Sequence, residues 1–186
     1  MLFRSSKKLF VVDNFYNNPN DIRHFALEQV YKEDLRFYKG LRSTKVFHPA
    51  GIKEEFEKII GQPIVDFPLS GINGCFQIVT ANDPQVYHHD LQQWAAMIYL
   101  TPNAPLSSGT RLHRSRINGA MHMDDPNCEQ AFGGGFYDST KFDTIADACN
   151  LYNRLVIMDA KNFHSAGSYF GQSREDGRLT QVFFII

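Results

Sequence analysis

The sequence predicts a mainly β domain of the α+β class, chiefly because of the order of its hydrophobic patterns. Two amphipathic helical patterns come first, and short strand-like patterns follow from Cys75 onward. Aromatic residues make up 13% of the chain, which favours a β-rich interior. Helices followed by a run of strands are typical of α+β domains. We therefore expect one domain over residues 1–186, with 1–70 as a helical support region and 71–186 as the core that carries the functional site.

The first 48 residues predict a strand, a helix and an irregular segment. Leu9–Val12 is a short apolar run that ends at an Asp-Asn pair, which predicts a strand followed by a turn. Asn18 and Pro19 then open a helix, because asparagine is a good N-cap and proline is tolerated at the first helical position. Apolar residues recur at helical spacing as far as Val30. Residues 31–48 are mixed in character and predict no regular element.

A second amphipathic helix is predicted from Ile52 to Ile60. Gly61 follows it, and glycine commonly ends helices because it adopts a left-handed conformation at little cost. Residues 115–153 are long and poorly patterned, so we expect them to be functional or mobile. Their glycine run, Gly133–Gly135, resembles a flexible lid more than a phosphate-binding loop, since no Lys-Ser/Thr pair follows it. Five strands are predicted after the second helix: Cys75–Thr80, Trp94–Leu100, Thr110–Arg114, Leu155–Met158 and Leu179–Ile185.

The bulk composition excludes several classes of protein. Hydrophobic residues at 43% and charged residues at 21% are ordinary for a soluble globular chain. A net charge of −1 gives no electrostatic reason to expect nucleic-acid binding. The sequence has no apolar run long enough for a membrane span, and its N-terminal apolar run lacks a signal-peptide cleavage site. Three cysteines without a Cys-x-x-Cys pair predict free thiols in a reducing cytoplasm.

Two histidines and an aspartate predict a metal site. His88 and Asp90 lie two residues apart in the segment YHHD, so both side chains share one face if this segment is a strand or a strand end. His164 follows the apolar strand pattern LVIMD after a short connection. Two imidazoles and one carboxylate are the ligand set that holds Fe(II) on one face and leaves other positions open. The alternative is a polar strand end with a structural histidine, and we interpret His89 as a surface or packing residue.

A second His-x-Asp triplet competes with the first. His122 and Asp124 lie in the segment HMDDPN, which is typical of a loop and has no strand pattern on either side. His88 and Asp90 are instead flanked by the strand patterns CFQIVT and WAAMIYL. We therefore favour the first triplet, and expect the second to lie near the mouth of the site.

Arg178 is the main candidate for binding a carboxylate. It begins the last predicted strand, where Arg178 and Thr180 share one face by alternation. An arginine that points inward is costly to bury without a partner, and its planar fork suits bidentate contact with a carboxylate. The alternatives are an ion pair with a carboxylate of the protein, and Arg174 as the binding arginine.

The order His-x-Asp, distal His and Arg-x-Thr resembles the Fe(II)/2-oxoglutarate-dependent dioxygenases, over roughly residues 72–186. The segments FQIVT, YHHD, MIYLTP and SSGTRLHR resemble an uncharacterised subgroup, and KLFVVDNFYNNPNDIRHFAL resembles the opening of small prolyl-hydroxylase-like members. The resemblance implies a double-stranded β-helix, or jelly roll, with the helices packed outside. It implies that His88, Asp90 and His164 hold Fe(II), that Arg178 and Thr180 bind 2-oxoglutarate, and that molecular oxygen is the second cosubstrate.

The activity implied is a hydroxylase that couples decarboxylation of 2-oxoglutarate to succinate with oxidation of a C–H bond. The substrate would be a peptidyl residue or a small molecule. Two alternatives stay open: a cupin-type metalloenzyme that does not use 2-oxoglutarate, and a non-catalytic binding module on the same fold. Four side chains are candidates for the wall of the cosubstrate pocket: Gln77, Ile78, Met97 and Tyr99.

A basic cluster follows Gly109-Thr110, where Arg111, His113, Arg114 and Arg116 occupy six positions. One pair of these residues at the mouth of the site would favour an acidic substrate. The alternative is a solvated basic face without a role.

Overall fold

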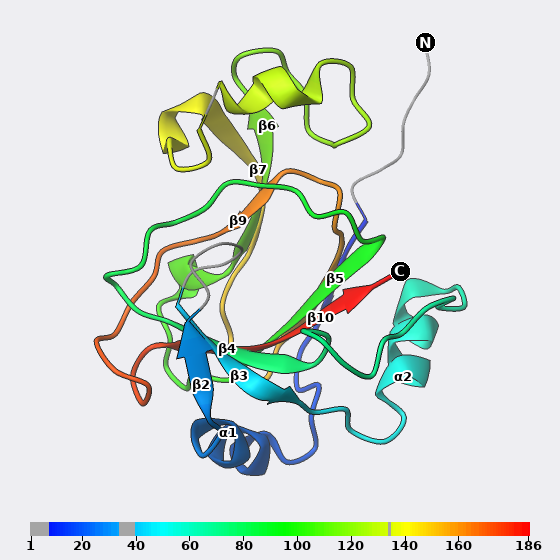
Figure 1. Ribbon diagram of the computed structural model, residues 1–186, viewed down its shortest axis with the longest axis vertical. Coiled ribbons are helices and arrows are strands. Elements are labelled where there is room, and N and C mark those ends of the chain that lie inside the picture. Colours follow the sequence, from blue (N-terminus) through cyan, green and yellow to red (C-terminus); the bar gives the residue numbers. More distant parts are fainter. Residues whose placement is uncertain (1–7, 34–39, 134) are drawn as a thin grey trace.

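A computed structural model describes residues 8–33, 40–133 and 135–186, and Figure 1 shows its two antiparallel sheets. The larger sheet has seven strands in the order β1-β8-β5-β10-β4-β3-β2, and the smaller has three in the order β7-β6-β9. The strands of the larger sheet are β1 Leu9–Val12, β2 Tyr31–Glu33, β3 Leu41–Val46, β4 Cys75–Val79, β5 Trp94–Tyr99, β8 Leu155–Asp159 and β10 Arg178–Ile185. Those of the smaller sheet are β6 Thr110–Ser115, β7 Phe142–Ala148 and β9 His164–Ala166.

The five strands predicted after residue 70, the first strand and both helices are found within a few residues of their expected bounds. The helices are α1 Pro19–Leu27 and α2 Ile52–Ile60. The prediction of an irregular segment over residues 31–48 is wrong, because β2 and β3 lie within it. The stretch 115–153 is also more ordered than expected. It contains β7 and two short 3-10 helices, Cys128–Phe132 and Ser139–Lys141.

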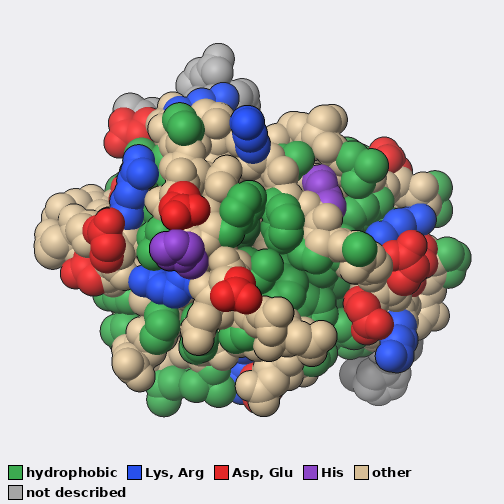
Figure 2. All heavy atoms as spheres, turned by 90° about the horizontal axis from the view of Figure 1, so that it is seen from below, with side chains coloured by type: hydrophobic (Ala, Val, Ile, Leu, Met, Phe, Trp, Pro, Cys, Tyr) green, Lys and Arg blue, Asp and Glu red, His purple; other side chains and the backbone are tan. Residues whose placement is uncertain are grey.

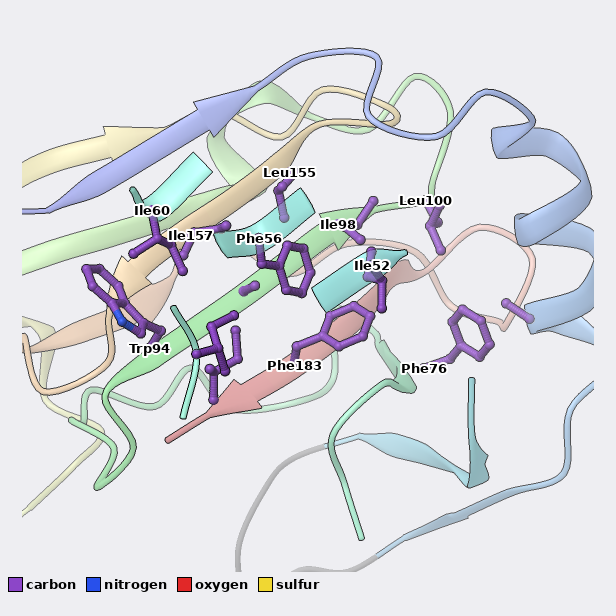
Figure 3. Packing of buried hydrophobic residues seen from close by; sticks show 14 of the residues in the cluster. Ile52, Phe56, Ile60, Phe76, Trp94, Ile98, Leu100, Leu155, Ile157 and Phe183 are labelled. Carbon is purple, nitrogen blue, oxygen red and sulfur yellow. The ribbon is translucent and has the colours of Figure 1, made fainter. Parts of the chain in front are cut away.

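The main core lies between α2 and the outer face of the larger sheet. Phe56 of α2 is fully buried, and its ring meets that of Phe183 on β10 edge-on, with 5.1 Å between centroids. Figure 3 shows Ile52, Phe56 and Ile60 of α2 directed toward side chains of the central strands. Gly61 ends α2 in the left-handed conformation, with φ 78°, as the sequence predicts.

Helix α1 covers another part of the same sheet. The Phe25 ring packs 5.0 Å from Phe47 and 6.0 Å from Phe76, measured between centroids. Figure 2 shows the molecule from the α1 side of Figure 1, where hydrophobic side chains gather in a central hollow between charged groups. Within the described residues, neither helix has the length and apolar character needed to cross a membrane.

Strand β10 separates the core from a cavity by the alternation of its side chains. Leu179, Phe183 and Ile185 belong to the core cluster with α2, whereas Arg178 and Val182 line the cavity on the opposite face. The smaller sheet forms the other wall of this cavity. The two sheets touch through a small cluster that includes Ala95 and Met158 from the larger sheet and Leu112 and Ile145 from the smaller.

Replacing Phe56 with alanine should lower the free energy of unfolding by about 3–5 kcal/mol, because removal of a buried ring leaves a cavity that the core fills only partly. Urea denaturation measures this loss. Lys58→Ala on the same helix is the control, since the Lys58 side chain is 77% exposed and the expected change is within about 0.5 kcal/mol. Equal losses in the two variants would show that the core does not depend on α2 packing.

Candidate metal centre and its cavity

Backbone pairing brings His88 and His164 side by side. His88 lies outside the named strands but forms an isolated antiparallel bridge with His164 of β9. The His88 amide donates to the His164 carbonyl at 3.0 Å, and the His164 amide donates to the His88 carbonyl at 2.7 Å. The Asp90 amide donates to the carbonyl of Ala160 at 2.8 Å. The backbone therefore fixes both ends of the YHHD segment against the chain that carries His164.

The three side chains converge on one point. His164 Nε2 lies 3.5 Å from Asp90 Oδ2, and His88 Nε2 lies 3.8 Å from Asp90 Oδ1. The two imidazole rings are 4.3 Å apart between centroids, and one donor atom from each of the three residues lies within 4.8 Å of the others. Two imidazole nitrogens and a carboxylate oxygen at this spacing fit a single divalent transition-metal ion.

Hydrogen bonds behind the two rings set their orientation. His164 Nδ1 donates to the carbonyl of Asn162 at 2.8 Å, and His88 Nδ1 lies 3.3 Å from the carbonyl of Val86. Because a carbonyl oxygen only accepts, these contacts place the hydrogen on Nδ1 and leave the Nε2 lone pair directed toward Asp90. The geometry is therefore that of imidazoles held ready to act as ligands.

Electrostatics keep the site in the protonation state that a metal needs. Burial and the neighbouring His164 lower the pKa of His88 to about 4, so this ring is neutral at neutral pH. Burial pushes the pKa of Asp90 upward, but the neighbouring imidazoles of His164 and His88 offset this effect and lower the pKa overall. Asp90 is therefore an anion across the physiological range.

The second His-x-Asp triplet has a different arrangement. His122 Nε2 faces Asp159, 3.4 Å from Oδ2, while His122 Nδ1 accepts a hydrogen bond from the Asp124 amide at 3.1 Å. Asp124 also lies 3.9 Å from Lys161 Nζ. In the described part of the chain, the one cluster of three metal-ligating side chains is His88, Asp90 and His164. The contacts of His122 instead tie its loop to the end of β8.

Arg178 is buried, and its guanidinium reaches the same cavity. Nε donates to the carbonyl of Ser108 at 2.8 Å, Nη2 donates to that of Gly109 at 3.4 Å, and the guanidinium carbon lies 5.3 Å from the centre of the Tyr99 ring. Among the described residues, no carboxylate lies within ion-pair distance of Arg178. Arg174 is exposed and packs 4.9 Å from the Tyr31 ring, outside the cavity. The geometry therefore favours Arg178 over Arg174 as a binding residue.

Of the polar residues expected in the cosubstrate pocket, Gln77 lines the cavity, whereas Tyr99 and Thr180 are not among its described lining residues. Tyr99 Oη lies 2.7 Å from Thr110 Oγ1, and burial raises the pKa of Tyr99, which keeps its hydroxyl protonated. Thr180 is fully buried, and its hydroxyl has no hydrogen-bond partner among the described residues. Gln77, which pairs with Thr180 across β4 and β10, lines the cavity. The Thr180 hydroxyl is therefore an unsatisfied buried group on the face of β10 that carries Arg178.

The prediction that Ile78 lines the wall of the cosubstrate pocket is wrong. Ile78 packs in the core cluster on the opposite face of β4, because adjacent residues of a strand point to opposite sides. Met97 lines the cavity as expected. We expected His89 to be a surface or packing residue. Its ring stacks on that of Phe163, with 6.0 Å between centroids, and His89 also lines the cavity.

The cavity between the sheets measures about 700 Å³ and contains a second arginine that the sequence did not indicate. Arg42 of β3 is buried, and its guanidinium carbon lies 5.5 Å from the centre of the Phe184 ring. The pairing of β3 with β4 shifts register between Arg42 and Val46, so the segment shows no simple alternation. We find no sequence signal that could have placed Arg42 in the site.

The basic cluster on β6 does not reach the cavity. Arg111 pairs with Asp147 at 2.8 Å, while Arg114 and Arg116 pair with Asp143 at 2.9 and 2.7 Å. These acidic residues lie on the neighbouring strand β7. Two aspartates therefore pair with all three arginines of the cluster, and this arrangement gives no support to the predicted role of the cluster in substrate binding.

The glycine run lies partly outside the described residues. Gly133 adopts a left-handed conformation, with φ 52°, at the end of a 3-10 helix, and Gly134 is not among the described positions. Phe136 and Tyr137 follow the run and line the cavity. The two residues that directly follow the expected lid therefore contribute side chains to the cavity.

The fold has two β-sheets, and the cavity between them contains a candidate transition-metal site and a buried arginine. No protein-family model matches the chain, and a search of curated proteins finds no match. Solved structures with a similar fold include HygX from Streptomyces hygroscopicus with nickel, 2-oxoglutarate and hygromycin B bound. The TM-score is 0.64 at 10% identity, over 96% of this chain and 82% of that one.

Two other solved structures are similar. HygX with iron bound gives a TM-score of 0.56 at 10% identity, over 96% of this chain and 82% of that one. A Pseudomonas putida prolyl-4-hydroxylase gives 0.54 at 11% identity, over 97% of this chain and 93% of that one. At these identities the likeness establishes a shared, mainly β fold.

Proposed function

We propose that this protein is an Fe(II)- and 2-oxoglutarate-dependent oxygenase, most simply a hydroxylase, with a double-stranded β-helix as its core. The observation that carries the proposal is the convergence of His88, Asp90 and His164 in a cavity that also contains Arg178. A set of metal-ligating side chains alone fits many enzymes. Such a set beside a buried arginine that has no carboxylate partner among the described residues fits an enzyme that binds a dicarboxylate at the metal.

In this proposal His88 and His164 give their Nε2 atoms, and Asp90 gives one carboxylate oxygen, to Fe(II). When bound, Fe(II) and 2-oxoglutarate supply the chemistry that converts molecular oxygen and 2-oxoglutarate into succinate, carbon dioxide and an oxidised substrate. Arg178 binds the far carboxylate of 2-oxoglutarate, with the Thr180 hydroxyl as an additional donor. The fold neighbours that bind iron, nickel and 2-oxoglutarate support this assignment of cofactors.

Tyr99 and Gln77 complete the proposed cosubstrate pocket. The Tyr99 hydroxyl bonds Thr110 and stays protonated, and its ring supports the Arg178 guanidinium, so both residues keep a fixed orientation. Apolar side chains such as Met97 and Val182 line the same cavity and reduce the number of water molecules near the metal. The residues of the chain therefore position and shield the reacting groups.

The purified protein should bind 2-oxoglutarate only when a divalent metal is present, and should release succinate slowly without any added substrate. Calorimetry in the presence of Mn(II) measures binding, and mass spectrometry after addition of Fe(II) and oxygen measures succinate. A chelator provides the control and should abolish both signals. Metal binding without 2-oxoglutarate binding would support a cupin-type metalloenzyme, and the absence of metal binding would support a non-catalytic binding module.

A further inference from the structure

The candidate metal ligands and Arg178 occupy different levels of the cavity between the sheets. At one level the Tyr99 hydroxyl of β5 meets Thr110 of β6, and the Arg178 guanidinium lies against the Tyr99 ring. Two residues farther along β6, Leu112 pairs with His164. Two residues of a strand span about 7 Å. A ligand group held by Arg178 therefore lies to one side of the metal ligands and leaves their opposite side for a second molecule.

The opposite side of the cavity is bounded by the end of the sheet wall that contains Phe184 and Ala95. Ala95 lies four residues along β5 from Tyr99 and pairs with Phe184 of β10. Ala95 also packs in one cluster with Leu112, the partner of His164, so this end of the wall is level with the metal ligands. Phe184 and Ala95 both line the cavity. The wall next to the metal ligands is therefore hydrophobic.

Two exposed hydrophobic residues flank the segment that carries His88 and Asp90. Leu91 directly follows Asp90 and is 74% exposed. Phe136 is 52% exposed, and its carbonyl accepts a hydrogen bond from the Tyr87 amide at 2.7 Å, which holds it beside the start of the segment. Leu91 and Phe136 both line the cavity. Hydrophobic side chains therefore lie at both ends of the segment that supplies two of the three metal ligands.

Ile72 extends the hydrophobic surface from the wall to the rim of the cavity. The side chain of its neighbour Asn73 accepts a hydrogen bond from the Phe184 amide at 2.9 Å, so the backbone next to Ile72 is held beside Phe184. Ile72 lines the cavity and is 42% exposed. Exposed hydrophobic side chains at the rim of a cavity are typical of a binding site for an apolar group. The entrance and the inner wall therefore have the same character.

The charged and polar groups of the cavity disfavour a cationic or a highly hydroxylated substrate. Asp90 is the one carboxylate among the described lining residues, and the proposed metal site uses it. Hydroxyl groups that are buried against hydrophobic side chains without hydrogen-bond partners cost free energy. Gln92 follows Leu91 and also lines the cavity, so it can bond a single polar group of a ligand.

We propose that the primary substrate is a small neutral molecule whose hydrophobic body lies beside the metal, in contact with Leu91, Phe136 and Phe184. The inference rests on the proposed function, because it assigns the Arg178 end of the cavity to 2-oxoglutarate and the Phe184 end to the molecule that is oxidised. The cavity volume of about 700 Å³ is in the range of small-molecule sites. Removal of hydrophobic surface from water drives binding.

Cyclohexanol is a suitable probe, and myo-inositol is its polar counterpart, with the same ring and a hydroxyl group on every carbon. Cyclohexylammonium is the cationic counterpart. The protein is loaded with Mn(II) and saturating 2-oxoglutarate, and the relaxation of probe protons by the bound Mn(II) reports binding near the metal. Cyclohexanol should bind at least about tenfold more tightly than either counterpart, because a small apolar contact in a pocket is worth about tenfold to 200-fold.

The double variant Leu91→Ser/Phe136→Ser should weaken cyclohexanol binding by at least about tenfold, for the same reason. Phe136→Leu alone should retain most of the binding, because leucine keeps the hydrophobic contact. Val30→Ser/Ile117→Ser is the matched control, since these residues are 69% and 51% exposed and are not among the described residues that line the cavity. Mn(II) titration checks that each variant is folded, and Phe136→Ser alone replaces the double variant if that variant loses Mn(II) binding.

The inference is overturned if cyclohexanol does not bind, if wild type binds myo-inositol or cyclohexylammonium as tightly, or if the double variant binds cyclohexanol as wild type does. If wild type does not bind 2-oxoglutarate, the proposed function fails instead. The probes are then compared with Mn(II) alone, and a preference for cyclohexanol that the double variant lacks still supports the hydrophobic site.

Discussion

Asp90→Ala should abolish metal binding. Asp90 supplies the one carboxylate of the cluster, and its oxygens lie 3.5 and 3.8 Å from the two imidazole nitrogens. Loss of a residue that only supports a ligand typically costs 10–100-fold in metal affinity, so loss of a ligand should cost more than about 100-fold. Calorimetric titration with Mn(II) measures the effect, and circular dichroism checks the fold.

The matched control is Asp124→Ala in the second His-x-Asp triplet. Asp124 is exposed, and its carboxylate lies near Lys161 and His122 rather than in the cavity. Metal affinity should therefore stay within about twofold of wild type. If Asp124→Ala abolished binding and Asp90→Ala did not, the metal centre would have to be reassigned to the loop of His122.

Arg178→Lys should weaken 2-oxoglutarate binding by about tenfold to 150-fold and leave metal affinity intact. The loss of a charge-assisted bidentate contact corresponds to roughly 1.5–3 kcal/mol. Lysine keeps the positive charge but lacks the planar fork, and it cannot hold the carbonyls of Ser108 and Gly109 as Arg178 does. Titration of 2-oxoglutarate into the Mn(II)-loaded protein measures the affinity.

Arg174→Lys serves as the control for Arg178→Lys. Arg174 was the alternative anchor, and it lies in an exposed turn outside the cavity. Its replacement should not change the affinity for 2-oxoglutarate. An unchanged affinity in Arg178→Lys would show that another residue binds the distal carboxylate, and Arg42 would then be the next candidate.

Local patterns were sufficient to predict much of the fold. The apolar spacing of Ile52–Ile60 and the glycine that follows define a helix from neighbouring residues alone. The alternation along Arg178–Ile185 likewise predicted that Arg178 lies on the opposite face of the strand from Leu179, which packs in the core. These elements could be predicted because the burial of each one is encoded within its own few residues.

Strand β7 could not be predicted in this way, because partners elsewhere in the chain stabilise it. Asp143 and Asp147 would be unfavourable in an isolated strand. In the sheet they lie directly opposite Arg114 and Arg111 of β6 and form ion pairs with them. The segment is therefore a strand only in the context of its neighbour.

The candidate site likewise contains residues that the sequence predicted and a residue that it did not. His88 and Asp90 were found because they lie two residues apart in one segment, between two clear strand patterns. Arg42 was missed because it reaches the cavity from a strand whose pairing is irregular. Short-range motifs can therefore reveal metal ligands, whereas groups that contact other parts of a ligand require the tertiary structure.

The two faces of β10 have a consequence for how this protein can change over evolutionary time. Val182 and Phe184 face the cavity, and Leu179, Phe183 and Ile185 face the core, so mutations on the same strand act on separate properties. A library that varies only the cavity-facing positions should yield folded proteins with altered ligand preference. New selectivity can therefore arise on this strand while the core that sustains the fold is retained.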